Sequence, residues 1–222
     1  EYYKDIAVLA YRLPSGDLSM TELNPKVSSS GGKFSLSALT DGDLTNNTFL
    51  PAARANNKAW IQFEFRNPLK VHSLTLVSSE QGINYGSGKN RVLEVSDDGR
   101  QFNAVFEIPG PSAIPRTYTF PPITAKFFRI SFITPELPPR SGFNPPPASG
   151  SPPPPPPPPG VRIPEIILHT VARVNRAEDK AGFTAAFGLF DLATPAVADD
   201  DAVNKPDIID LTEKTGPDGR LN

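Results

Sequence analysis

The sequence predicts an all-β fold, a sandwich built from many short strands. Several runs alternate apolar and polar residues with a period of two, most clearly residues 60–65 and 71–77. Such alternation is typical of half-buried strands. Turn residues such as Asn67-Pro68 separate the runs at short intervals, and the chain has no heptads and no repeat of fixed period. Short strands spaced by turns indicate a β-sandwich.

We expect the strands in the following order along the chain: 5–13, 60–65, 71–77, 91–96, 102–108, 116–120, 127–133, 163–174 and 208–211. Residues 24–33 and 80–89 are polar and rich in glycine or serine, which favours loops. Pro121-Pro122 is expected to end a strand. Residues 181–192 are small and apolar and fit either a helix or a strand.

The predicted turns are made by glycine, proline and acidic residues. Asn67-Pro68 is expected to be a turn between two strands. Asp97-Asp98-Gly99-Arg100 lies between two alternating runs and predicts a hairpin turn of type I or I′.

Composition excludes several classes of protein. At 222 residues the chain is long enough for one large β domain, or for a domain with an appendage. The net charge is −2 and charges are interspersed, so we expect no nucleic-acid partner and no polybasic membrane surface. The absence of cysteine excludes disulfides and thiolate metal sites. No apolar run is long enough to insert into a membrane, and no signal peptide is visible. Because Glu1 opens directly into a strand-like run, we expect a trimmed or processed chain.

A proline-rich insertion occupies residues 135–160. It contains eight successive prolines, Pro152 to Pro159. Polyproline forms an extended helix without backbone donors and cannot join a sheet ladder. The tract is either a ligand for a partner domain with an aromatic groove, or a surface loop that acts as a stiff spacer. Surface loops tolerate insertions well, which favours the spacer.

The chain shows no recognisable catalytic motif. Its histidines, His72 and His169, both lie inside strand patterns without a nucleophile motif beside them, so we interpret them as structural. The glycine-rich loop around Tyr85 lacks the spacing of a phosphate-binding loop. The carboxylate pair of a glycoside hydrolase meets in space and cannot be identified from sequence.

A metal site is the more plausible chemistry. Calcium binds six to eight oxygen ligands, and Asp41, Asp43, Thr45 and Thr48 offer such oxygens in one short stretch. Glu165 interrupts an otherwise apolar strand and could complete the shell from a distance. The alternative is an Asx-type turn that satisfies its own backbone.

Sugar recognition would use aromatic and polar side chains on loops at one end of the sandwich. The candidates are Phe49, Arg54, Tyr85, Arg140 and Phe143. Each is equally explained as an ordinary loop residue.

The order of these segments resembles the discoidin-like, or coagulation-factor C-type, branch of galactose-binding-like domains. The segments that carry the resemblance are ALTDGD at 38–43, AWIQFEF at 59–65, LEVSDDGRQF at 93–102, AKFFRISF at 125–132 and PEIILH at 164–169. The resemblance implies an eight-stranded jelly roll with a structural calcium. Carried over to this chain, it implies Asp41, Asp43, Thr48 and Glu165 as ligands, some through backbone carbonyls. The family usually has its Thr earlier than Thr48, and often a Trp where Phe49 stands.

The flanking segments resemble a different family. KDIAVLAYRLP at 4–14, NRAEDKAGF at 175–183 and PDIIDLTEKTGPDGRL at 206–221 look like parts of family-106 glycoside hydrolases, the alpha-L-rhamnosidases. In those enzymes such segments bracket a β-sandwich beside a catalytic barrel. The resemblance implies that this chain is a portion of a larger enzyme, with the catalytic acid and base outside it.

Together these observations divide the chain into three parts. Residues 1–33 form an N-terminal strand and linker, 34–174 the discoidin-like jelly-roll β-sandwich with its insertion, and 175–222 a C-terminal extension of the parent module. The expected function is non-catalytic carbohydrate binding within a secreted or periplasmic bacterial glycoside hydrolase. The alternative is a structural domain that braces the parent catalytic domain and binds no sugar.

Overall fold

The structure is a computed structural model that describes residues 7–11, 16–45, 48–53, 56–80, 91–109, 112–134, 160–181, 193–199, 202–216 and 220–221. Its strands are β1 (Leu9–Tyr11), β2 (Lys26–Ser29), β3 (Phe49–Pro51), β4 (Lys58–Glu80), β5 (Arg91–Ser96), β6 (Asn103–Glu107), β7 (Ser112–Ile133), β8 (Gly160–His169) and β9 (Ile208–Asp210). The helical segments are α1 (Met20–Leu23), α2 (Ala177–Lys180) and the 3-10 turns η1 (Ser37–Leu39), η4 (Lys205–Asp207) and η5 (Thr212–Lys214).

These elements confirm the predicted all-β jelly-roll sandwich with short terminal extensions. Within the described ranges, no helix is long and apolar enough to cross a membrane. The prolines from Pro152 to Pro159 lie outside the described residues, so both interpretations of the tract stay predictions.

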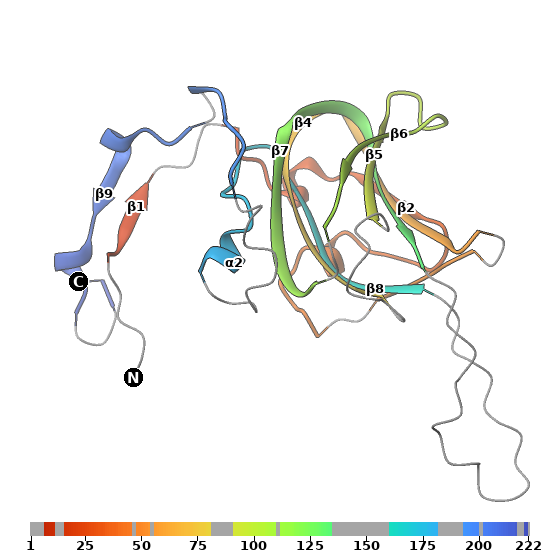
Figure 1. Cartoon of the computed structure of the whole chain (residues 1–222), viewed down its shortest axis with the longest axis horizontal. Helices are drawn as coiled ribbons and strands as arrows, with labels where there is room; N and C mark the ends of the chain where they lie inside the picture. Colours follow the sequence, from red (N-terminus) through yellow and green to blue (C-terminus); the bar gives the residue numbers. More distant parts are fainter. Residues whose placement is uncertain are drawn as a thin grey trace, which may run out of the picture.

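Two long strands, β4 and β7, build both layers of the sandwich (Figure 1). Residues 58–64 of β4 pair with residues 127–133 of β7, and β2 and β5 extend this layer on either side. Residues 69–80 of β4 pair with the earlier part of β7 and with β8 in the other layer. β6 continues the first layer beside β5, and β3 continues the second beside β8.

The prolines of β4 and β7 lie at irregularities of the ladder between these strands, which corrects the prediction of separate short strands. The β4–β7 register is interrupted between Glu64 and Leu69, and Asn67-Pro68 falls inside that interruption. Pro121-Pro122 likewise falls at a register shift of β7. Proline has no N–H to give to a ladder and is tolerated at bulges. These dipeptides therefore bend continuous strands instead of ending them.

The expected loop at 24–33 contains a strand, so that prediction was wrong in part. β2 pairs antiparallel with residues 61–64 of β4, and Val27 lies opposite Phe63. Local composition is polar because β2 is a short strand at the edge of its layer, where one side faces solvent. The partner that makes it a strand is more than thirty residues away, so composition alone did not reveal it.

The predicted hairpin turn between β5 and β6 is present. Oδ1 of Asp98 accepts hydrogen bonds from the backbone N–H groups of Arg100 (2.8 Å) and Gln101 (3.0 Å), and these bonds lower the pKa of Asp98 to about 2. In the turn only Gly99 has a positive φ, +71°. A type I′ turn needs positive φ at both central residues, so that alternative is excluded.

The core lies between the two layers and is rich in phenylalanine. Phe63, Phe128 and Phe132 are fully buried, together with Ile61 and Ile130 on the same strands. These residues occupy the alternate positions that the sequence pattern assigns to one face. The intervening residues of the same strands therefore form the outer face of the layer.

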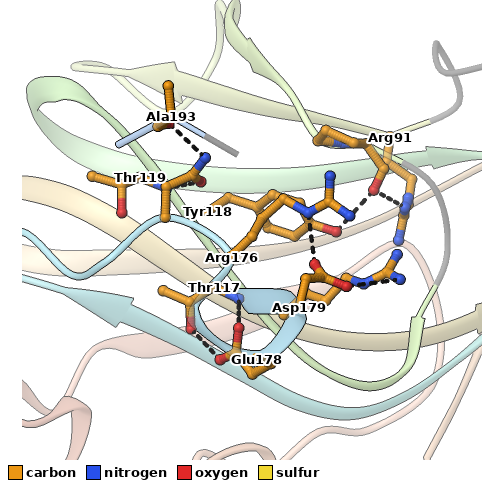
Figure 2. Close-up of polar contacts among 11 residues, drawn as sticks. Arg91, Thr117, Tyr118, Thr119, Arg176, Glu178, Asp179 and Ala193 are labelled. Atoms are coloured by element: carbon orange, nitrogen blue, oxygen red, sulfur yellow. Dashed lines mark hydrogen bonds and ion pairs between the residues drawn. The ribbon is translucent and has the colours of Figure 1, made fainter. Parts of the chain in front are cut away.

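The segment after β8 covers the edge of β7 that has no strand partner (Figure 2). Arg176 donates its backbone N–H to the carbonyl of Thr117 at 2.7 Å. The backbone N–H groups of Thr117 and Thr119 donate to the side chains of Glu178 (3.0 Å) and Asn175 (3.1 Å). Side chains thus replace a neighbouring strand along this edge, which would otherwise expose backbone groups.

A buried ion-pair cluster fixes this covering segment (Figure 2). Nε of Arg176 lies 2.6 Å from Oδ2 of Asp179, and Nη2 of Arg116 lies 3.4 Å from Oδ1 of the same carboxylate. The side chain of Asp179 is only 2 % exposed. One buried carboxylate therefore holds two guanidinium groups at the edge of β7.

The two ends of the chain form a separate ribbon. β1 pairs antiparallel with β9 in a two-stranded sheet, beside the sandwich in Figure 1. Its apolar side chains are open to solvent: Leu9, Tyr11 and Ile209 are 54 %, 51 % and 59 % exposed. An isolated two-stranded sheet has little stability of its own.

We predict that the Asp179→Ala variant loses about 3 kcal/mol of unfolding free energy, because it leaves two partly buried guanidinium groups without their carboxylate. Urea denaturation of the variant and the wild type measures the difference. The exposed Asp207 provides a control, since Asp207→Ala should change stability by less than about 0.5 kcal/mol. Equal effects from the two substitutions would contradict the role of the cluster.

Candidate functional site

The acidic stretch after η1 forms two successive Asx turns. Oδ1 of Asp41 accepts the backbone N–H of Asp43 at 2.9 Å. Oδ1 of Asp43 in turn accepts the backbone N–H (2.9 Å) and the hydroxyl (2.6 Å) of Thr45. Gly42 joins them at a φ of +74°, a conformation that favours glycine. The Asx-turn alternative is therefore present, with Oδ1 of both carboxylates accepting hydrogen bonds inside the turn.

Glu165 lies close enough to this turn to sense its charge. The residue is 8 % exposed and makes no hydrogen bond or ion pair with the described part of the chain. Burial, and next the negative charge of Asp41, raise the pKa of Glu165 above its usual value. Two carboxylates without a neighbouring cation repel each other when both are ionised. A bound cation, or a proton shared between the two carboxylates, would remove this repulsion.

The other predicted ligands, Thr48 and Asp43, make hydrogen bonds within the protein. The carbonyl oxygen of Thr48 accepts the backbone N–H of Ile163 at 3.0 Å, which attaches the end of the loop to β8. Oδ1 of Asp43 accepts hydrogen bonds from Thr45, as described above. Within the described ranges, no group of three or more His, Cys, Asp or Glu residues could hold a metal. A calcium ion between Asp41 and Glu165 would therefore need carbonyl, hydroxyl or water oxygens for the rest of its shell.

The predicted sugar-binding residues are mostly outside the described part of the chain. Arg54, Tyr85, Arg140 and Phe143 all lie there. Phe49 is half-buried on β3, and its ring covers Gly160, where an added Cβ would lie 2.3 Å from Cζ of the ring. Phe49 thus packs within the protein, and its part in sugar binding stays a prediction.

The histidines belong to the interior of the second layer. His72 is 2 % exposed on β4. Nε2 of His169 lies 2.8 Å from the hydroxyl of Thr75, which also contacts the hydroxyl of Thr117 at 2.8 Å. Burial, together with the charge of Arg173, lowers the pKa of His169 to about 4. These surroundings agree with the structural role expected for both residues.

The outer face of the first layer gathers aromatic and polar side chains. Cζ of Arg129, on β7, lies 4.4 Å from the ring centroid of Trp60 and 3.4 Å from that of Phe102. Its Nε and Nη2 both donate to Oε1 of Gln62, at 3.2 and 2.7 Å. The paired strands β4, β7 and β5 carry these residues across the face, since Gln62 is opposite Arg129 and Arg129 opposite Glu94.

An ion pair adjoins the aromatic group. Glu94 accepts from Nζ of Lys58 at 3.0 Å and from the hydroxyl of Ser131 at 2.6 Å. Both carboxylate oxygens of Glu94 are therefore in use, and its charge is balanced by Lys58. The face combines half-buried rings with oriented donors, which is the chemistry of a binding surface for polar ligands.

Comparison with known protein families gives a match over the whole chain. Residues 1–222 match glycoside hydrolase family 106, alpha-L-rhamnosidase. The chain belongs to this family. The resemblance of the flanking segments to family-106 enzymes is therefore confirmed. No curated protein matches the chain.

Among solved structures, the chain is similar to the rhamnosidase from Novosphingobium sp. PP1Y, with a TM-score of 0.65 and 24 % identity. The similarity covers 98 % of this family-106 chain and 17 % of that chain. The family-106 chain thus corresponds to a small part of the length of that relative, and the likeness concerns the fold.

Smaller structures are also similar over part of the chain. A pectin-binding carbohydrate-binding module has a TM-score of 0.42 and 16 % identity, with 64 % of this chain and 88 % of that chain covered. A family-32 carbohydrate-binding module produced by Clostridium perfringens has a TM-score of 0.44 and 15 % identity, with 67 % of this chain and 95 % of that chain covered.

Sequence reasoning missed Arg129 of this family-106 domain, although a signal for it was present. The alternation of residues 60–65 puts Trp60 and Gln62 on one side of the strand, opposite to the apolar side. The run FFRISFI has the same alternation, with Arg129 and Ser131 between core residues. Pairing these two runs would have placed Arg129 beside Trp60 and Gln62. Strand partners cannot be read from either run alone.

We predict that His169 makes the stability of the domain fall between about pH 7 and about pH 5. Its folded pKa lies below its unfolded value, so the unfolded chain binds more protons in this range and stability rises with pH. The expected loss on acidification is about 2 kcal/mol. Denaturant unfolding of the wild type and of His169→Gln at both pH values measures it. A His169→Gln variant with an undiminished pH dependence would contradict this assignment.

Proposed function

We propose that this family-106 chain is a non-catalytic, carbohydrate-binding β-sandwich of a longer, secreted or periplasmic alpha-L-rhamnosidase-like enzyme. The observation that carries the proposal is the outer face of the first layer, where Trp60 and Phe102 lie beside Gln62 and Arg129. Family membership supports a carbohydrate-related role. Sandwich sheets expose such a face because every second side chain points away from the core.

A sugar ring suits this face chemically. Pyranose rings present apolar C–H patches next to hydroxyl groups, and aromatic rings with adjacent hydrogen-bonding groups match both. The ring of Trp60 is half-buried, and its Nε1–H has no hydrogen-bond partner within the described residues. The described surface thus offers an aromatic contact together with a donor that has no internal partner.

The proposal assigns catalysis to another part of the longer enzyme. Two carboxylates of this domain have structural contacts: Glu178 accepts from the N–H and hydroxyl of Thr117, and Asp179 binds Arg176. Burial and the charge of Asp41 raise the pKa of Glu165, and a raised pKa is a property of general acids, so an acid–base role for Glu165 needs a test. The domain alone should therefore be assayed with an aryl rhamnoside, where we expect no turnover.

We predict binding of plant-type oligosaccharides in the micromolar to millimolar range common to single small sites, measured by calorimetry after a glycan-array screen. Trp60→Ala should weaken binding roughly tenfold, because it removes the aromatic contact. Tyr85→Ala, in the loop predicted from sequence, serves as the matched comparison. A larger loss with Tyr85→Ala would favour the loop site. No binding to any glycan would refute the carbohydrate-binding role.

We also propose that calcium binds between the Asp41 turn and β8. The support is the raised pKa of Glu165, which reports an uncompensated carboxylate beside Asp41. A divalent cation there would remove the repulsion and connect the loop after η1 to β8. The proposed calcium ion would have a structural role, because it would hold the loop that leads into β3 against the second layer.

We predict that calcium raises the melting temperature and that Glu165→Gln abolishes this increase. A ligand that binds the folded state alone at a hundred times its Kd stabilises by about 2.7 kcal/mol. With chelator, Glu165→Gln should be at least as stable as the wild type at neutral pH, because a buried carboxylate with a raised pKa disfavours folding there.

Glu107→Gln is the control for the calcium experiment, since Glu107 is an exposed strand carboxylate. It should respond to calcium like the wild type. A wild-type melting temperature that is identical in calcium and in chelator would favour the plain Asx turns.

A second candidate function is favoured by the terminal ribbon. β1 and β9 expose Leu9, Tyr11 and Ile209 on a two-stranded sheet that has no core of its own. Such a ribbon would be stabilised by burial against another part of a longer enzyme. On this alternative the sandwich braces the parent catalytic domain, and sugar binding is not required.

A further inference from the structure

Arg129 is held in a fixed orientation by three side chains, which we call the Arg129 clamp: Trp60, Gln62 and Phe102. The two rings lie on the guanidinium at 4.4 and 3.4 Å from centroid to Cζ. Gln62 accepts two hydrogen bonds from its Nε–Nη2 edge. Stacking on rings together with a two-bond contact leaves the guanidinium little rotational freedom.

The clamp leaves one edge of the guanidinium open. A guanidinium has a second edge, formed by Nη1 and the remaining hydrogen of Nη2, that matches the two oxygens of a carboxylate. Within the described residues, Nη1 has no hydrogen-bond partner, and Arg129 forms no ion pair. Among the described residues, the open edge of this fixed bidentate donor is therefore bonded to no acid.

The charges around the clamp favour an anion. Glu94 is the nearest acid that influences Arg129, and both of its oxygens are used by Lys58 and Ser131. Burial lowers the pKa of Arg129, and the charge of Glu94 acts in the opposite direction. A guanidinium that is partly removed from water and faces a neutral amide gains from an incoming carboxylate.

We propose that the Arg129 clamp binds the carboxylate of an acidic oligosaccharide, a chain that contains uronic acid residues. The proposal rests on the proposed carbohydrate-binding function and adds the class of sugar and the group that selects it. The carboxylate pairs with the open guanidinium edge. Trp60 Nε1 and the amide nitrogen of Gln62, which have no partners within the described residues, serve the hydroxyl groups of the same or the adjacent sugar ring.

The sequence supplies a reporter for this test, since Trp60 is the only tryptophan of the chain. An oligogalacturonate is titrated into the intact chain while Trp60 fluorescence is recorded, and calorimetry is run in parallel. The fully methyl-esterified oligomer is the second probe, because it keeps the sugar and removes the charge. We expect a fluorescence change with the acid, at least about tenfold weaker binding of the ester, and weaker binding of the acid as salt is raised.

Two variants test the guanidinium itself. Arg129→Gln should weaken binding of the acid by at least about tenfold and leave the ester unchanged. Arg129→Lys keeps the charge and loses the planar fork, so it should also bind the acid more weakly than the wild type. Lys126→Gln is the matched control. It removes a cation from the same strand, and this cation lies over the ring of Phe127, outside the clamp. The variant should bind like the wild type.

The outcomes separate this inference from the function on which it rests. Equal affinity of acid and ester, or an Arg129→Gln variant that binds the acid like the wild type, would overturn the clamp while carbohydrate binding stands. Failure to bind acidic, esterified and neutral oligosaccharides alike would remove the proposed function, and the clamp with it. Melting temperatures of the variants within a few degrees of the wild type exclude misfolding as the cause of a loss.

Discussion

The pairing of β4 with β7 is the constraint on which the rest of the structure depends. These strands run side by side through both layers, with register shifts at three places. Because each strand belongs to both layers, the layers cannot separate without breaking the ladder. The core phenylalanines Phe63 and Phe128 lie opposite each other on this pair. Hydrophobic burial and backbone hydrogen bonding therefore reinforce one register, and a shift of one strand by one residue would turn the ring of that strand outward.

The same pairing decides where the edges of the sheet lie and how they are protected. β5 covers only residues 127–132 of β7, which leaves the earlier part of the strand without a strand neighbour on the edge opposite β4. Asn175, Arg176 and Glu178 fill that place with side-chain and backbone hydrogen bonds. Residues 175–178, which belong to the segment that resembles the alpha-L-rhamnosidase family in sequence, thus complete this edge of the sandwich. A family motif at this position has a physical reason, because an uncovered edge would be free to pair with another chain.

Strand periodicity predicted the fold well. It could not predict the features that depend on which strands pair, namely β2 and the neighbours of Arg129. The alternation of residues 60–65 gave both the core face and the outer face correctly. The prolines were misread as strand ends because proline breaks ladders in general, whereas here they fall at bulges where no N–H is needed. β2 was missed because a serine-rich edge strand is defined by its partner. Arg129 was missed for the same reason, since its neighbours Trp60 and Phe102 come from other segments.

The charged side chains of the sandwich show where ligands are most plausible. Asp179 is matched by Arg176 and Arg116, and Glu94 by Lys58, so these charges need nothing from outside. Glu165 and Arg129 are different: the charge that acts on Glu165 is the like charge of Asp41, and Arg129 bonds to a neutral amide while Glu94 acts on it only through its charge. A folded protein rarely keeps such groups unless a ligand or a proton compensates them. The negative group lies on β8 in one layer and the positive group on β7 in the other. The proposed cation and the proposed anion would therefore bind on different layers of the sandwich.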